Sequence, residues 1–192
     1  MILRLNIIVA STRPGRVGPL IGDWFLGVAE AEGSFAPQLV DLADFALPLY
    51  DEPHHPSLQR YEHDHTRRWS ASVAGADAFV FVTPEYNYGP TPALLNALNY
   101  VYKEWNYKPA GFVSYGGISG GMRGVQATKP TLSTLMMVPI LEGVTIPMVS
   151  GHLEDGSFKP SDSHRNAAIL LLSQLHRWAV ALKPMRDSLP KC

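Results

Sequence analysis

Two hydroxyl groups and two arginines are concentrated in S-T-R-P-G-R, residues 11–16. This segment follows an apolar run and precedes a stretch with helical spacing, so its backbone N–H groups are expected near the start of a helix. Guanidinium groups, hydroxyls and free N–H groups together bind a phosphate dianion. The segment therefore predicts a phosphate site, and a plain turn with solvated arginines is the alternative. Neither the G-x-x-x-x-G-K-[ST] nor the G-x-G-x-x-G motif fits these residues.

A second segment, P-E-Y-N-Y-G-P-T-P at 84–92, combines stiff prolines with two tyrosines and an asparagine. Flat aromatic surface and a few fixed polar groups suit a planar heteroaromatic ring. The prolines restrict the free loop, so little entropy is lost when a ligand binds. The segment favours a ring-binding slot. The alternative is that Tyr86 and Tyr88 cap a strand or form a subunit contact.

Four glycines in Y-G-G-I-S-G-G, residues 115–121, allow the backbone to approach a neighbouring molecule closely. Free N–H groups in this segment would bond the carbonyl edge of a ring and stabilise negative charge on it, whereas a flexible linker is the alternative. A phosphate site, a ring slot and a wall of donors match flavin mononucleotide (FMN), which has a phosphate, a ribityl chain and a tricyclic ring.

Alternating strands and helices must position these segments. Continuous apolar runs predict strands covered on both faces, and therefore a parallel sheet with helices on both sides. Right-handed crossovers favour the strand order 2-1-3-4-5, which is an α/β, flavodoxin-like three-layer sandwich with residues 1–192 as a single domain. The three segments then follow strands 1, 3 and 4 at one rim. The predicted strands are 3–10, 36–42, 77–83, 110–115 and 143–149, and the predicted helices are 17–33, 63–75, 92–105, 121–138 and 162–183.

Two details refine this assignment. Thr91 is expected to be the N-cap of the third helix, with Pro92 at its first position. Pro130 removes a backbone hydrogen bond from the fourth helix and predicts a kink or break near 126–129. Residues 45–62 are expected to form a long loop.

The composition excludes several classes of function. The chain of 192 residues is 46% hydrophobic and 17% charged, which is typical of a globular protein. A net charge of −1 argues against nucleic-acid binding. The single cysteine, Cys192, excludes a disulfide within the chain and a phosphatase that needs Cys-x5-Arg after its first strand. No signal peptide or membrane span is recognised, so a cytoplasmic protein without a membrane partner is expected.

Histidines and carboxylates cluster between residues 51 and 65. His and carboxylate side chains are metal ligands, so a metal site is conceivable. No strong ligand spacing such as H-E-x-x-H is present, which favours a solvated loop and helix start. We therefore expect no metal. The cluster contains Asp51, Glu52, His54, His55, Glu62, His63, Asp64 and His65.

Several motifs resemble the NADPH-dependent FMN reductase family: S-T-R-P-G-R, L-P-L-Y-D-E-P at 47–53, P-E-Y-N-Y-G-x-x-P-A-L-L-N-A-L at 84–98 and K-P-A-G-F-V-S-Y-G-G at 108–117. That family is flavodoxin-like and includes quinone, azo-dye and chromate reductases. The resemblance extends over nearly the whole chain. It departs at Ala10, where glycine is common, and at Lys129–Pro130, within a helix that is usually uninterrupted.

The resemblance implies an FMN site, position by position. It also implies a homodimer or homotetramer in which the partner subunit covers part of the flavin. By this resemblance Ser11, Thr12, Arg13, Arg16 and Val17 hold the phosphate, Pro84, Glu85, Tyr86 and Asn87 line the ring and the ribityl chain, and Ser114, Tyr115, Gly116 and Gly117 line the pyrimidine side.

The resulting hypothesis is an FMN-dependent NAD(P)H oxidoreductase. It would pass a hydride from NADPH, or NADH, through FMN to a small acceptor such as a quinone, an azo compound, chromate or free flavin. No catalytic acid or base is assigned, because the cofactor carries the chemistry. The alternative is a flavodoxin-like electron carrier without nicotinamide chemistry of its own. Such carriers tend to be strongly acidic, and the balance of 16 basic to 17 acidic residues speaks against one.

Overall fold

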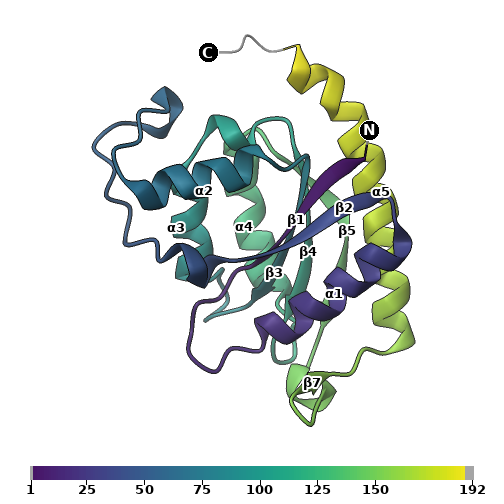
Figure 1. Cartoon of the computed structure of the whole chain (residues 1–192). Helices are drawn as coiled ribbons and strands as arrows, with labels where there is room; N and C mark the ends of the chain where they lie inside the picture. The colour runs from purple at the N-terminus through teal and green to yellow at the C-terminus, as the bar shows by residue number, and fades with distance from the viewer. Residues whose placement is uncertain (1, 189–192) are drawn as a thin grey trace.

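A five-stranded parallel sheet forms the middle layer of the structure, a computed structural model that describes residues 2–188 (Figure 1). The strand order β2-β1-β3-β4-β5 confirms the predicted topology. Cys192 lies outside the described residues. The strands are β1 (Leu3–Val9), β2 (Phe35–Asp41), β3 (Ala78–Pro84), β4 (Pro109–Tyr115) and β5 (Val138–Ile146).

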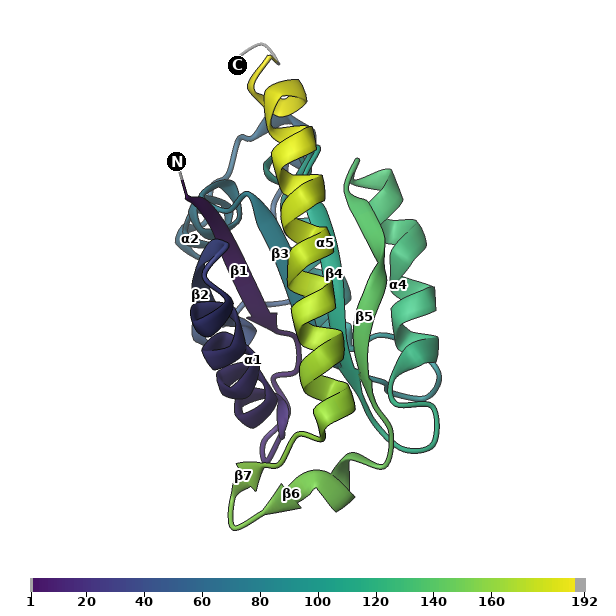
Figure 2. The same ribbon diagram turned by 90° about the vertical axis from the view of Figure 1, so that its right-hand side faces the viewer.

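Helices cover both faces of this sheet, as the flavodoxin-like three-layer prediction requires (Figure 2). Helices α1 (Gly18–Glu32) and α5 (Asp162–Asp187) lie on one face. Helices α2 (Asp64–Ala74), α3 (Pro92–Tyr100) and α4 (Met122–Thr134) lie on the other. Within residues 2–188, no helix combines the length and the apolar character that crossing a membrane requires. Short 3₁₀ turns occur at Leu42–Phe45, Pro56–Leu58, Lys103–Trp105 and Val149–His152.

The central strands divide their side chains between two hydrophobic cores. Ile7 and Val80 pack on the side of α1 and α5, whereas Ile8 and Phe81 pack on the other side. Side chains alternate along a strand, so a strand buried on both faces must be apolar at every position. Burial of each such side chain stabilises the fold by about 1.5–3 kcal/mol. This explains why the strands were recognisable as continuous apolar runs.

Two helix boundaries lie where the expected capping residues place them. The hydroxyl of Thr91 accepts the N–H of Leu94 at 3.1 Å, and Pro92 occupies the first position of α3. Helix α1 ends at Gly33, which has the left-handed φ of 77° that glycine adopts without steric cost. The predicted Thr91 cap is confirmed, and Gly33 lies at the end of the predicted helix 17–33.

The third helix is shorter than predicted. It ends at Tyr100 instead of residue 105, and Lys103–Trp105 forms a separate 3₁₀ turn. Trp105 is fully buried and donates its indole N–H to the carbonyl of Leu98 at 3.2 Å. The chain must fold back to make this contact, so packing of a large aromatic side chain overrides the helical pattern.

The boundaries between α4 and β5 also differ from the prediction. The helix ends at Thr134, and the strand covers 138–146 instead of 143–149. The run L-M-M-V-P-I is apolar throughout, so periodicity could not separate a helix end from a strand start. Met136, with a φ of 56°, lies in the turn that joins them.

The predicted break at Pro130 is not observed, since α4 continues through this residue. The proline leaves the carbonyl of Gln126 without its usual donor. Gln126 is exposed, so water can bond that carbonyl. The loss is therefore tolerated.

The connection between β5 and α5 is structured. It contains the turn Val149–His152 and a hairpin of β6 (Leu153–Glu154) and β7 (Ser157–Phe158). Figure 2 shows this hairpin at the same end of the molecule as the loop between β1 and α1. No helix or strand is predicted between residues 149 and 162, yet this segment reaches the rim where the ligand is expected to bind.

The Thr91 hydroxyl joins two elements, because it also donates to the carbonyl of Ala10 after β1. Replacement of Thr91 by Ala should lower the free energy of unfolding by about 2 kcal/mol, since a buried carbonyl and a helix N–H both lose their partner. Urea unfolding followed by circular dichroism measures this loss. Thr91→Ser keeps the hydroxyl and should lose much less; equal stability of the two variants would contradict this account of the cap.

Candidate functional site

The three unusual segments meet at the carboxyl rim of the sheet, because β1, β3 and β4 are adjacent and parallel. They enclose a cavity of about 320 Å³. Eight of the thirteen predicted site residues line it, namely Arg13, Arg16, Val17, Pro84, Glu85, Tyr86, Tyr115 and Gly116. Three lining residues were not predicted, namely Val149, Ser150 and Leu153, which follow β5.

The remaining predicted residues lie around this cavity without lining it. Thr12 instead lines a neighbouring cavity of about 450 Å³ beside the turn Leu42–Phe45. Ser114 is buried, with its hydroxyl 3.5 Å from the carbonyl of Val144. Ser11, Asn87 and Gly117 belong to the loops that shape the cavity walls. The roles assigned to all thirteen residues stay predictions.

The two arginines of the first segment have different surroundings. Arg16 pairs with Asp41 at the end of β2, with 2.5 Å between guanidinium nitrogen and carboxylate oxygen. Both side chains are about four-fifths buried, at 21% and 19% exposure. Arg13 is exposed and has no carboxylate partner within residues 2–188. Most of the positive charge available to a new anion therefore comes from Arg13. The Arg16–Asp41 pair was not foreseen, because nothing local links residues 25 positions apart.

Two buried donors beside this segment have no hydrogen-bond partner among the described residues: the Nε of Arg16 and the hydroxyl of Tyr115. The Tyr115 hydroxyl lies below the start of α1, where a Cβ at Gly18 would come within 2.9 Å of it. Burial raises the pKa of Tyr115, and Tyr86 raises it further, so the hydroxyl keeps its proton. Buried donors without acceptors are costly, and an anion at this place would satisfy them.

The start of α1 adds backbone donors to the same place. Its N-cap, Val17, makes no side-chain cap, and no acidic residue lies in the first turn. Pro19 has no N–H, and Ile21 bonds the Val17 carbonyl. Gly18 and Leu20 therefore supply the N–H groups available to an anion, and the helix dipole favours negative charge there. The set of donors fits a phosphate group.

A hydrogen bond of 2.6 Å joins the hydroxyls of Ser11 and Tyr86. It connects the loop after β1 to the loop after β3 and fixes the orientation of the Tyr86 ring. Because Ser11 is only 1% exposed, its hydroxyl is committed to this contact.

The loop after β3 is a tight hairpin turn. Tyr86 and Gly89 exchange two backbone hydrogen bonds, of 3.0 and 2.9 Å. The central residues Asn87 and Tyr88 have φ values of 50° and 67°, the left-handed combination of a type I′ turn. The usual signal for this turn is Asn-Gly; here Tyr occupies the second position, so the sequence did not reveal it.

Glu85 fastens this turn to the loop after β4. Its carboxylate accepts the hydroxyl of Ser119 at 2.7 Å and the backbone N–H of Arg123, in the first turn of α4, at 3.0 Å. Burial acts to raise the pKa of Glu85, but these hydrogen bonds and the Arg123 charge outweigh it and lower the pKa. Glu85 is therefore ionised and caps the start of α4.

The glycine segment after β4 is a shaped loop. Gly116 donates to the carbonyl of Ile146 at 3.2 Å and accepts the N–H of Val149 at 2.9 Å, while Gly117 accepts the N–H of Met148 at 2.8 Å. The flexible-linker alternative is thus disfavoured. The Gly116 N–H, expected to be free for a ligand, already has an acceptor. The same hydrogen bonds bring the segment after β5 to the cavity.

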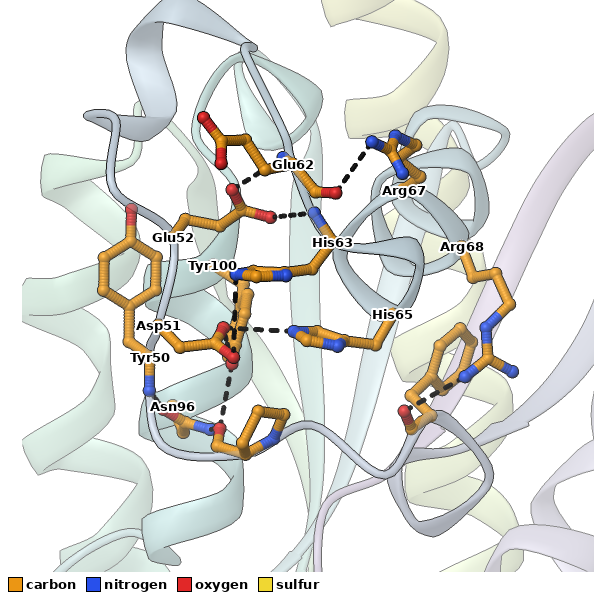
Figure 3. Close-up of polar contacts among 12 residues, drawn as sticks. Tyr50, Asp51, Glu52, Glu62, His63, His65, Arg67, Arg68, Asn96 and Tyr100 are labelled. Carbon is orange, nitrogen blue, oxygen red and sulfur yellow. Dashed lines mark hydrogen bonds and ion pairs between the residues drawn. The ribbon is translucent and has the colours of Figure 1, made fainter.

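The histidine cluster holds the long loop before α2 (Figure 3). Asp51 accepts the hydroxyl of Tyr100 at 3.0 Å and lies 3.1 Å from a ring nitrogen of His65, on which the ring of His63 stacks. Glu52 accepts the N–H groups of residues 62 and 63 at 2.8 and 3.1 Å. Among residues 2–188, no three His, Cys, Asp or Glu side chains are grouped so as to hold a metal ion.

Comparison with known proteins adds an independent finding. The family model described as NADPH-dependent FMN reductase matches residues 3–150. An NAD(P)H-dependent FMN reductase of Schizosaccharomyces pombe is 40% identical over 162 residues, covering 76% of this chain and 80% of that protein. One of Saccharomyces cerevisiae is 36% identical over 160 residues, covering 78% and 83%. More distant relatives are named as a quinone reductase and an azoreductase.

Solved structures share the fold. The flavoenzyme NAD(P)H:(acceptor) oxidoreductase FerB from Paracoccus denitrificans matches with a TM-score of 0.75 at 18% identity, over 94% of this chain and 98% of that chain. At this identity the match establishes the three-layer architecture alone.

The Glu52 carboxylate generates a pH-dependent prediction. Burial acts to raise its pKa, but the N–H groups of residues 62 and 63 and the charge of His63 lower it overall. A carboxyl whose pKa is lower in the folded state stabilises the fold fully above its unfolded pKa, about 4.3, and this contribution is lost progressively as the pH falls through the lower folded-state pKa. Glu52→Gln should lose about 1 kcal/mol at neutral pH and progressively less in acid.

Urea unfolding at pH 7 and pH 4 tests this. Glu62→Gln is the matched control, because the side chain of Glu62 is 58% exposed and only pairs with His54. It should change stability little at either pH. A Glu52→Gln loss that is the same at both pH values would refute the assigned role of the carboxylate.

Proposed function

Because the chain belongs to the NADPH-dependent FMN reductase family, we propose that it binds FMN at the carboxyl rim of its sheet and reduces a small acceptor with NADPH or NADH. It is an oxidoreductase by family, and the family's cofactors are FMN and NAD(P)H. The acceptor is a quinone, an azo compound, chromate or free flavin. Relatives named for quinone and azo-dye reduction support the first two.

One observation carries the proposed place of FMN: donors without acceptors converge on a single cavity. They are the exposed guanidinium of Arg13, the buried hydroxyl of Tyr115 and the uncapped first turn of α1. An anion of the charge and size of a phosphate satisfies all three. A flavodoxin-like carrier needs the same donors, but the family's activity favours the enzyme.

Bound FMN supplies the hydride chemistry, and the protein supplies position and electrostatics. Arg13 and the start of α1 hold the phosphate. Tyr86, whose ring is oriented by its hydrogen bond to Ser11, presents an aromatic face to the flavin ring. The backbone at Gly116 and Gly117 carries no side chains, so one edge of the flavin ring can approach it closely. The remaining assigned residues, Thr12, Arg16, Val17, Pro84, Glu85, Asn87 and Ser114, support these three walls.

We further propose that residues 1–192 act as a single flavin-binding domain of a cytoplasmic homodimer or homotetramer. Exposed apolar side chains support association between subunits, among them Leu141 at 88% and Val180 at 51% exposure.

The direct test is the purified protein. It should be yellow, release FMN on denaturation and oxidise NADPH in the presence of a quinone. NADPH alone should rapidly reduce the bound flavin and remove its yellow colour. A flavodoxin-like electron carrier, which does not react with NADPH, would keep its colour. A colourless protein that fails to bind added FMN would refute the proposed function.

The unequal surroundings of the two arginines predict unequal effects. Arg13→Gln should weaken FMN binding by roughly ten- to a hundredfold, as expected for loss of a charge-assisted hydrogen bond. Binding of riboflavin, which lacks the phosphate, should be unaffected. Arg16→Gln should chiefly lower stability, because it leaves Asp41 without its partner.

Flavin-fluorescence titration of both variants with FMN and riboflavin measures these effects. If Arg16→Gln weakened FMN binding more than Arg13→Gln did, Arg16 would be the principal anchor and our assignment would be reversed.

A further inference from the structure

Tyr88 occupies a strained position at the rim. Its φ of 67° lies in the left-handed region, which bulky side chains rarely adopt and which costs on the order of 1–3 kcal/mol. Packing into the core does not compensate, because the side chain is 67% exposed. The ring instead lies against the guanidinium of Arg123, whose central carbon is 4.1 Å from the ring centroid. A strained, exposed aromatic residue of this kind suggests a function outside the fold.

The backbone, and not this stacking contact, holds the two residues in place. The Glu85 carboxylate caps the first turn of α4 through the Arg123 N–H. One position further, a Cβ at Gly124 would come within 2.9 Å of the carbonyl of Gly89, so helix and turn are in direct contact. The hairpin turn and α4 are therefore docked by their main chains, which leaves the side chains of Tyr88 and Arg123 free to bind a ligand.

The charge of Arg123 is available at the surface. Its side chain is 45% exposed and meets Glu85 through a single nitrogen–oxygen contact of 3.3 Å. A guanidinium has five N–H donors, so several remain unused. Glu85 itself lines the cavity, which places Arg123 immediately beside it.

Exposed apolar side chains lie in the loop after β4, at the start of α4 and in the segment after β5. Ile118 is 84% exposed, Met122 41% and Met148 61%. Hydrogen bonds connect these segments: Met148 donates its N–H to Gly117, and the hydroxyl of Thr145, near the end of β5, contacts the Met122 sulfur at 3.2 Å. Methionine side chains adapt their shape and make favourable contacts with aromatic rings. The surface thus combines a cation, an aromatic face and adaptable apolar groups.

We propose that Arg123 and Tyr88 form an acceptor-recognition site that selects planar aromatic acceptors bearing a negative charge, such as a sulfonated quinone, over their neutral analogues. This rests on the proposed function and deepens it. The ring of the acceptor lies on the apolar side chains, and its anionic group binds the free donors of Arg123. Reduction to the hydroquinone takes one hydride from NADPH, by way of the flavin, and one proton from water.

The test compares two acceptors in the FMN-loaded enzyme: a naphthoquinone and its sulfonated analogue, each with saturating NADPH. The measured quantity is the ratio of their kcat/KM values, in which changes of flavin content or NADPH binding cancel. Arg123→Gln should lower the preference for the sulfonate by about tenfold, the size of effect expected for a partly exposed charge-assisted contact. Arg123→Lys, which keeps the charge and can keep the contact with Glu85, should restore part of it.

Matched variants separate recognition from general effects. Arg177→Gln removes an arginine from α5 whose side chain bonds only Gln174 among residues 2–188, so it changes the net charge equally and should leave the ratio unchanged. Tyr88→Asn removes the ring but keeps a residue that tolerates positive φ, and should lower the ratio by a smaller factor. The preference of the unmodified enzyme should weaken with added salt.

The outcomes distinguish this inference from the proposed function. If the unmodified enzyme reduces neither quinone, the recognition site is refuted, whereas the proposed function falls only if the protein also fails to bind FMN. If it reduces both, and Arg123→Gln leaves the ratio within about twofold of the original, the proposed function stands and the recognition site is refuted. A rise in the KM for NADPH with an unchanged ratio also refutes it, because Arg123 would then serve the phosphates of the reductant.

Discussion

The parallel adjacency of β1, β3 and β4 is the constraint on which the site depends. Because the three strands run in the same direction, residues more than a hundred positions apart leave the sheet at one rim. Hydrogen bonds join these loops to one another and to the segment after β5, among them Ser11 to Tyr86, Glu85 to Ser119 and Gly116 to Val149. Each crosses from one loop to the next. The sheet therefore fixes the positions of the loops that form the cavity walls, although these walls contain little regular structure.

Electrostatic balance divides this rim into two parts. On the side of α1, helix N–H groups and Arg13 have no described carboxylate to balance them, and that part suits an anion. On the side of α4, Glu85 neutralises the helix start and shares one contact with Arg123. The second part is nearly neutral in total but retains an exposed guanidinium on an aromatic ring. The two ends can therefore bind different groups without competing for one charge.

Sequence reasoning succeeded where local chemistry decides the structure. Strands buried on both faces are continuous apolar runs, and Thr91 and Gly33 mark helix ends through their own backbone and side-chain preferences. It failed where distant packing decides. Trp105 ends α3 by bonding Leu98 from the core, and the apolar run after Leu135 contains no periodic signal for the start of β5. For the site, residue types located three walls of the cavity. The fourth, at Val149 to Leu153, depends on where β5 ends, and so it was missed together with that boundary.

The ion pair of Arg16 and Asp41 has an evolutionary consequence. Both members are largely shielded from water, and Asp41 also accepts the N–H of Ala43, so it holds the turn after β2. Replacing one of the two residues leaves the other charge buried and without its partner. Replacing both by neutral residues removes the two charges together. Descendants of this sequence should therefore retain the two residues together or lose them together. The loop after β1 and the turn after β2 would then co-evolve even without a ligand that contacts both.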